Sequence, residues 1–218
     1  MLTVHHLNNS RSQRVLWLLE ELGVPYEIKK YERDRETMLA PPELQKIHPL
    51  GKSPVITDGD TTVAESGAIL EYLVERYGDG RFAPASGTPE HLTYRYFMHY
   101  AEGSLMPYLL LRFIFGRIRV KAPFLIRPVA KKIASSIDEI AVAPNLARHV
   151  AFLDGHLAGR TWFAGELSAA DAQMLYPMEA LAARYDGVPA SLTAWVERAH
   201  AREAYQRALE RGGPYQAA

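Results

Sequence analysis

Hydrophobic and polar positions change period several times within the first eighty residues. Runs of alternating or continuous β-prone side chains are typical of strands, and apolar residues at three- and four-residue intervals are typical of helices. These patterns predict strands near residues 2–7, 26–28, 55–56 and 61–63, and helices near residues 13–22, 42–46 and 69–77. Asp58-Gly59-Asp60 separates the last two strands and is a hairpin signal. The predicted order is therefore β-α-β-α-β-β-α.

Beyond residue 80 the pattern becomes purely helical. Residues 81–89 carry glycine and proline among polar side chains, which is typical of a linker. Long helical stripes follow near residues 90–115, 123–157, 169–184 and 192–211, and no strand alternation accompanies them. Ser168 and Asp171 have the spacing of a capping box. We expect an α/β domain at residues 1–80 and an all-α domain at residues 90–218.

Composition narrows the chemistry. The 218-residue chain contains no cysteine, so sulfur chemistry requires a ligand that brings its own thiol. Its 25 basic and 25 acidic residues balance, which disfavours a general nucleic-acid binder. The longest apolar run, Leu105 to Leu111, is too short to span a membrane. The first residues lack a signal-peptide pattern, so we expect a cytoplasmic protein without a membrane or nucleic-acid partner.

Three short motifs fall at loops of the predicted β-α-β-α-β-β-α order: residues 9–14 (NSRSQR), residues 48–55 (HPLGKSPV) and Glu65-Ser66-Gly67. Together they make the chain resemble the cytosolic glutathione S-transferases over essentially its whole length, with bacterial and fungal members lacking a catalytic cysteine the most similar. The resemblance implies a thioredoxin-like N-terminal domain that binds glutathione as co-substrate. It also implies a helical domain that shapes an electrophile pocket, and a homodimer.

The second and third motifs carry the expected glutathione contacts. Glu65 and Ser66 begin a helix, whose first amides have no internal partners and attract a carboxylate. The resemblance implies that Ser66 takes the γ-glutamyl carboxylate and that Glu65 faces the ammonium group. It also implies a cis bond between Ser53 and Pro54, with the Ser53 backbone pairing with the cysteinyl segment. Lys52 is our candidate for the glycine carboxylate.

The first motif holds the candidates for activating the thiol. A free thiol has a pKa near ~8.5, and lowering it by ~2 units requires about 2.7 kcal/mol of preferential thiolate stabilisation. Asn9, Ser10 and Arg11 are the three candidates, and we favour Ser10 first and Asn9 second. The alternative is that Ser10 or Ser12 simply caps the following helix.

The helical domain offers fewer distinct signals. The resemblance suggests Tyr108 and Arg112 for the electrophile pocket and Glu102 for a contact across the dimer interface. Seven basic residues and no acidic residue lie between Glu102 and Asp138, which we interpret as a solvated helix face. The histidines show no spacing typical of a metal site, so we expect no metal.

We therefore predict a glutathione S-transferase that holds glutathione as a thiolate for attack on a hydrophobic electrophile, as in detoxification. One alternative is a glutathione-dependent disulfide reductase or peroxidase that uses the same site. Another is a non-catalytic binding or assembly module with the same fold. The sequence leaves the second substrate open.

Overall fold

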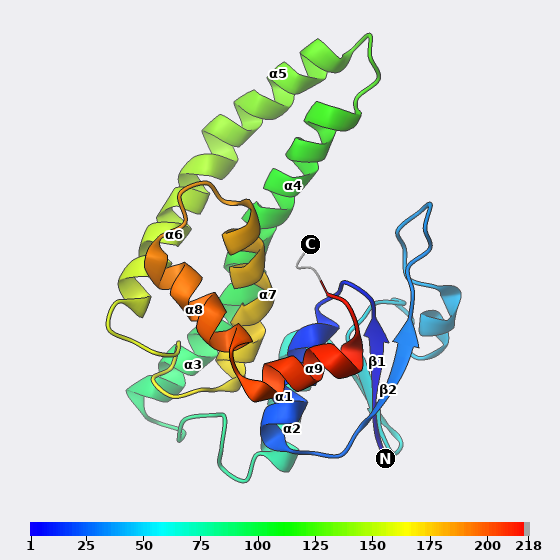
Figure 1. Ribbon diagram of the computed structural model, residues 1–218, viewed down its shortest axis with the longest axis vertical. Coiled ribbons are helices and arrows are strands. Elements are labelled where there is room, and N and C mark those ends of the chain that lie inside the picture. The colour runs from blue at the N-terminus through cyan, green and yellow to red at the C-terminus, as the bar shows by residue number, and fades with distance from the viewer. Residues whose placement is uncertain (216–218) are drawn as a thin grey trace.

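The computed structural model describes residues 1–215, and its N-terminal part has the predicted order of elements (Figure 1). The elements are β1 (Leu2–Leu7), α1 (Ser12–Leu22), β2 (Glu27–Tyr31), the 3-10 helix η1 (Pro42–Lys46), β3 (Val55–Asp58), β4 (Thr61–Ala64) and α2 (Ser66–Tyr77). The sheet order is β2-β1-β3-β4, with β1 parallel to β2 and the other pairs antiparallel. The mixed four-stranded sheet confirms the predicted α/β class.

The remaining elements are helical, which confirms the second half of the fold prediction. They are α3 (Pro89–Tyr100), η2 (Ala101–Leu105), α4 (Met106–Lys121), α5 (Arg127–Ile137), η3 (Asp138–Val142), α6 (Ala143–Leu157), α7 (Ala169–Arg184), α8 (Ala190–His200) and α9 (Glu203–Gly212). Figure 1 shows α4 and α5 as an antiparallel hairpin that extends beyond the rest of the molecule. The predicted linker falls between α2 and α3.

Two π-helical turns, η2 and η3, interrupt this hairpin. A π turn widens the helix by one residue and shifts the face that the following residues present. The η2 turn joins α3 to α4, and η3 joins α5 to α6. The helical periodicity of the sequence did not reveal either turn, and η2 contributes Glu102 to the site described below.

Helix α1 lies at the centre of the molecule. Its apolar side chains Val15, Leu16 and Leu19 are fully buried, and so are its polar residues Gln13 and Arg14. The helix is covered on several sides because α2, α7 and α9 all pack against it in addition to the sheet. Figure 1 shows α9 lying across α1, so the end of the described chain returns to the N-terminal part.

Helix α7 forms the core of the helical part. It begins with the predicted capping box, in which the Ser168 amide donates to Asp171 over 2.9 Å. The Phe163 amide donates to the other oxygen of Asp171, also over 2.9 Å, so this carboxyl joins the preceding loop to the helix. Burial raises the pKa of Asp171 to about 6, although these hydrogen bonds oppose the rise.

Candidate functional site

A groove of about 720 Å³ lies between the loops that flank β3 and β4 and the helical turn η2. All five residues that we predicted for glutathione contacts line it: Lys52, Ser53, Pro54, Glu65 and Ser66. Arg11, Glu102 and Gln173 line its other side. The groove therefore combines residues from both parts of the chain, and it is open to an extended ligand.

The start of α2 supplies the anion-attracting end of the groove. Ser66 is the first residue of α2 and is only 6% exposed, whereas the Glu65 side chain is exposed. Glu65 has φ 72° and ψ 126°, a left-handed conformation that costs a non-glycine residue free energy. Such backbone outliers cluster at binding sites, where the surrounding structure enforces them. Gly67 follows, and a Cβ there would lie 3.5 Å from Nε2 of Gln173.

Ser53 is fixed to the edge of β1 by its hydroxyl group. Its Oγ donates to the His5 carbonyl over 2.8 Å and accepts from the Leu7 amide over 3.3 Å. The Ser53-Pro54 peptide bond is cis, as the family resemblance implied. Because the hydroxyl is used in this way, the main chain of Ser53 is the part that can contact a peptide in the groove. Lys52 is exposed beside it.

The loop before α1 does not place its three candidate residues equivalently. Ser10 is only 4% exposed, and its Oγ lies 2.7 Å from Oγ of Ser12 and accepts from the Ser12 amide. Ser12 in turn lies 2.8 Å from Nδ1 of His6. Ser10 thus stabilises the first turn of α1, which is the structural alternative that we had considered. Asn9 is exposed, with φ 47°, and lines neither cavity described here.

Arg11 is the member of the loop that faces ligand space. It lines the groove and also a second cavity of about 490 Å³ between α4 and α7. Its guanidinium lies 4.8 Å from the ring centroid of Tyr176, and its Nε donates to Glu102 Oε1 over 2.9 Å. Leu110 also lines both spaces, so these two residues mark where the groove meets the cavity.

A buried ion pair supports Arg11 from behind. Arg14 is 1% exposed; its Nη2 lies 3.0 Å from Glu102 Oε1 and its Nη1 donates to Gln173 Oε1 over 2.7 Å. Burial lowers the pKa of Arg14, and the Glu102 carboxylate opposes this change. Glu102 reaches the groove from its own chain. Sequence patterns did not indicate the Arg11–Glu102–Arg14 cluster or Gln173, because their contacts cross long sequence distances.

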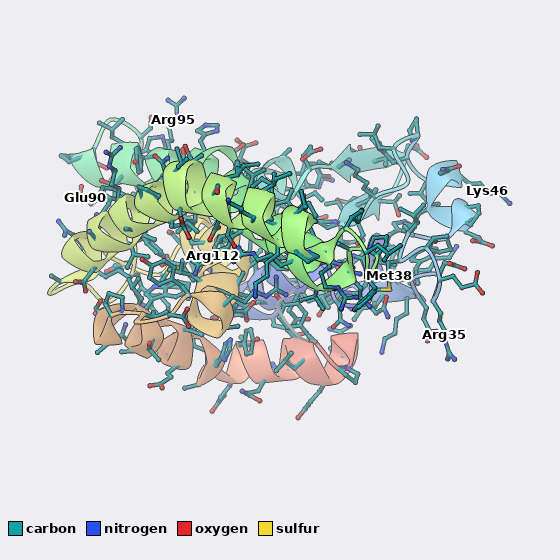
Figure 2. The ribbon with its side chains drawn as sticks, turned by 90° about the horizontal axis from the view of Figure 1, so that it is seen from above. Arg35, Met38, Lys46, Glu90, Arg95 and Arg112 are labelled. Atoms are coloured by element: carbon teal, nitrogen blue, oxygen red, sulfur yellow. The ribbon has the colours of Figure 1, made fainter. Side chains whose placement is uncertain are left out.

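The second cavity contains one of the two predicted pocket residues. Arg112 lines it together with Met106, Leu109 and Phe113 of the same helix. Tyr108 lies just outside this arc of α4, and its ring faces His149 of α6 at a centroid distance of 5.3 Å. We therefore do not retain Tyr108 as a pocket residue. Figure 2 shows Arg112 near the middle of the molecule, whereas Arg95 projects from its edge.

No metal-binding cluster of three or more histidine, aspartate or glutamate side chains occurs within residues 1–215. Over the same range, no helix combines the length and apolar character needed to cross a bilayer. The groove and cavity are thus lined only by side chains and backbone groups suited to an organic ligand.

Comparisons with known proteins point in one direction. The family model "Glutathione S-transferase, N-terminal domain" matches residues 1–75. Glutathione S-transferase 3 of Schizosaccharomyces pombe is 40% identical over 82% of this chain and 73% of its own length. Glutathione S-transferase 1 of Saccharomyces cerevisiae is 31% identical over 97% and 95%, respectively. A crystal structure of a glutathione S-transferase from Actinobacillus pleuropneumoniae has a TM-score of 0.79 and 31% identity, covering 97% of this chain and 93% of that one.

Proposed function

Because the chain belongs to the cytosolic glutathione S-transferase superfamily and is a glutathione transferase, we propose that the groove binds glutathione and that Arg11 stabilises its thiolate. The observation that supports this assignment is the position of Arg11, which lines both the groove and the apolar cavity. A sulfur held beside Arg11 is close to both reactants.

The proposed pose follows the charges along the groove. The γ-glutamyl carboxylate lies at the amides that begin α2 and at the Ser66 hydroxyl, because these groups are unpaired donors at a positive helix end. Glu65 faces the γ-glutamyl ammonium group. The cysteinyl segment pairs with the main chain of Ser53, and Lys52 attracts the glycine carboxylate.

The thiol then lies near the start of α1 and the Arg11 guanidinium. A positive charge and the helix end both favour the anionic form, so the thiol pKa falls and its proton passes to solvent. The thiolate attacks an electrophilic carbon held in the second cavity. With an aryl halide, a carbon–sulfur bond forms, the carbon–halogen bond breaks, and halide leaves with the bonding electron pair. Holding both reactants together supplies the remaining acceleration.

We assign Glu102 to its own subunit, where its Oε1 pairs with Arg11 and Arg14. This replaces the contact across a dimer interface suggested by the family resemblance. A homodimer remains part of the proposal, and sedimentation equilibrium tests it. A monomer that binds glutathione with full affinity would remove the dimer from the proposal and leave the site intact.

Calorimetric titration with glutathione tests the site directly. We expect Ser66→Ala to weaken binding about tenfold, since it removes one hydrogen bond to a charged group. Ser86→Ala, on an exposed loop, is the matched control and leaves the affinity unchanged. Unaltered affinity in Ser66→Ala would contradict the pose.

Two parallel assays test the reaction class. The proposal predicts that conjugation of an aryl halide dominates over reduction of hydroxyethyl disulfide. Faster disulfide reduction than conjugation would instead favour the glutathione-dependent reductase that uses the same groove.

A further inference from the structure

The cavity between α4 and α7 has an unusual combination of apolar walls and positive charge. Its lining includes Met106, Leu109 and Phe113, and also four arginines: Arg11, Arg112, Arg119 and Arg184. No aspartate or glutamate is among the lining residues, all of which belong to the described part of the chain. The sequence-based interpretation of a solvated basic face is therefore incomplete, because Arg112 and Arg119 face this cavity.

Two of the four charges are compensated by carboxylates behind the wall. Arg11 pairs with Glu102 at 2.9 Å, and Arg119 Nη2 lies 3.3 Å from Oδ2 of the buried Asp138. These pairs hold the two guanidinium groups in place and reduce their attraction for a second anion.

The other two charges lack such partners. Arg184 has no carboxylate within salt-bridge distance among residues 1–215, and its guanidinium stacks 4.9 Å from the ring centroid of Phe113. Arg112 stacks 5.2 Å from Tyr185, and its single acidic neighbour is the fully exposed Asp186 at 3.9 Å. Stacking fixes the planes of both guanidinium groups and leaves their N–H edges free to bind an oxyanion.

We propose that this cavity selects an amphipathic anion: an electrophile with an aromatic or alkyl body and a carboxylate or sulfonate group that binds Arg112 and Arg184. This inference rests on the proposed function, because it names the substrate class of the same site. The apolar body lies against Leu109 and Phe113, and the reactive carbon points toward Arg11 and the thiolate. A neutral electrophile of the same shape fills the cavity without using either arginine.

The dimensions of the cavity fit this substrate class. Its volume of about 490 Å³ is within the range of roughly 300–1,000 Å³ usual for small-molecule sites. Gly116 lies on its wall, and a Cβ built there meets no atom within 4 Å. A larger side chain at position 116 therefore enters the cavity, and in a helix interior leucine is better tolerated than glycine.

Binding of two fluorescent probes tests the proposal independently of catalysis. The anion 1-anilinonaphthalene-8-sulfonate and its neutral analogue N-phenyl-1-naphthylamine share an apolar body and differ in the sulfonate. We expect Arg184→Gln and Arg112→Gln each to weaken binding of the anionic probe about three- to tenfold, while the neutral probe changes less than about twofold. Arg148→Gln, exposed on α6, controls for overall charge. Gly116→Leu is expected to weaken both probes, which locates them in this cavity.

Equal losses for both probes in the two arginine variants would overturn the proposal, and so would loss of the anionic probe in Arg148→Gln. Full binding of both probes by Gly116→Leu would also overturn it, because the probes would then occupy another surface. Glutathione titration separates this result from the proposed function. Charge-selective binding without glutathione binding would leave the cavity assignment standing and contradict the transferase mechanism.

Discussion

The Nε atom of Arg11 lies 2.9 Å from Oε1 of Glu102, so the loop before α1 is ion-paired to a π-helical turn 91 residues later in the chain. The same carboxylate oxygen lies 3.0 Å from Nη2 of Arg14. One oxygen therefore holds both an arginine that faces ligand and an arginine that is buried. This arrangement joins the orientation of Arg11 to the packing between the two parts of the chain.

The shared carboxylate leads to a prediction about stability. Glu102→Gln keeps the shape of the side chain but removes its charge, and it leaves the buried Arg14 without a counter-ion. We expect the free energy of unfolding to fall by about 1–3 kcal/mol in urea titrations. Glu71→Gln is the control, because Glu71 lines the same groove and has no ion-pair partner within residues 1–215. A loss of equal size in both variants would contradict the role of the Arg14 pair.

Arg11 and Ser10 are expected to affect different properties of the enzyme. Arg11→Gln should raise the thiol pKa of bound glutathione by about 1 unit, because it removes the positive charge nearest the proposed sulfur site. Conjugation at neutral pH should fall about tenfold, in proportion to the thiolate fraction. Ultraviolet absorbance of the thiolate as a function of pH measures the shift. Arg11→Lys keeps the charge and should give an intermediate pKa.

Ser10→Ala should instead lower stability by about 1 kcal/mol and leave the thiol pKa unchanged, because its hydroxyl bonds to Ser12 inside the loop. The opposite result, a raised thiol pKa in Ser10→Ala and none in Arg11→Gln, would restore the order of candidates that the sequence favoured.

The fold and the groove could be predicted from the sequence because their signals are local. Strand and helix periods, the Asp58-Gly59-Asp60 hairpin and the capping box at Ser168 depend only on nearby residues. Ser66 and Ser53 were identified because each lies at a loop of the β-α-β-α-β-β-α order. Their placement in one groove then follows from the topology of the sheet.

The choice among Asn9, Ser10 and Arg11 could not be made in the same way, because it depends on which side of one turn faces the helical part. The contacts of Arg11 with Glu102 and Tyr176 cross from the first motif to η2 and α7. Tyr108 failed as a pocket residue for a related reason. A single helix pattern shows which residues share a face, and it does not show whether that face meets a cavity or another helix.

The pH dependence of stability should reflect His6, whose ring is 5% exposed and bonds to Ser12. Burial, assisted by the positive charge of Lys30, lowers its pKa from 6.5 to about 4. The native state therefore holds His6 neutral, and the unfolded chain binds a proton first as the pH falls. Stability from this group is present above pH 6.5 and is lost progressively as the pH falls toward 4.

Urea titrations at pH 7 and pH 5 measure this effect, and we expect His6 to account for about 2 kcal/mol of the difference. His6→Gln should lose correspondingly less stability between the two pH values. The pKa of His5 is also lowered by burial, but His5 is present in both proteins, so their difference isolates His6. His99→Gln, at an exposed position, should behave like the unaltered protein. An identical pH dependence in His6→Gln would contradict the assignment.

Gly51 is expected to control the shape of the groove beside Lys52. Its φ is 56°, and a Cβ there would lie 2.7 Å from Cγ of Gln45. Gly59 is the matched control, with φ 58° and no atom within 4 Å of an added Cβ. Alanine at either position should lower the free energy of unfolding by about 1 kcal/mol because of the left-handed backbone.

Gly51→Ala should lose a further 1–2 kcal/mol, approximately, because the added methyl group displaces Gln45 or the loop. That displacement moves Lys52 and Ser53, so glutathione affinity measured by calorimetry should fall in Gly51→Ala and stay unchanged in Gly59→Ala. Equal stability losses with unchanged affinity in both variants would mean that Gln45 yields without moving the loop. The groove would then tolerate a side chain at position 51, and the loop would not be the rigid support that the proposed glutathione pose requires.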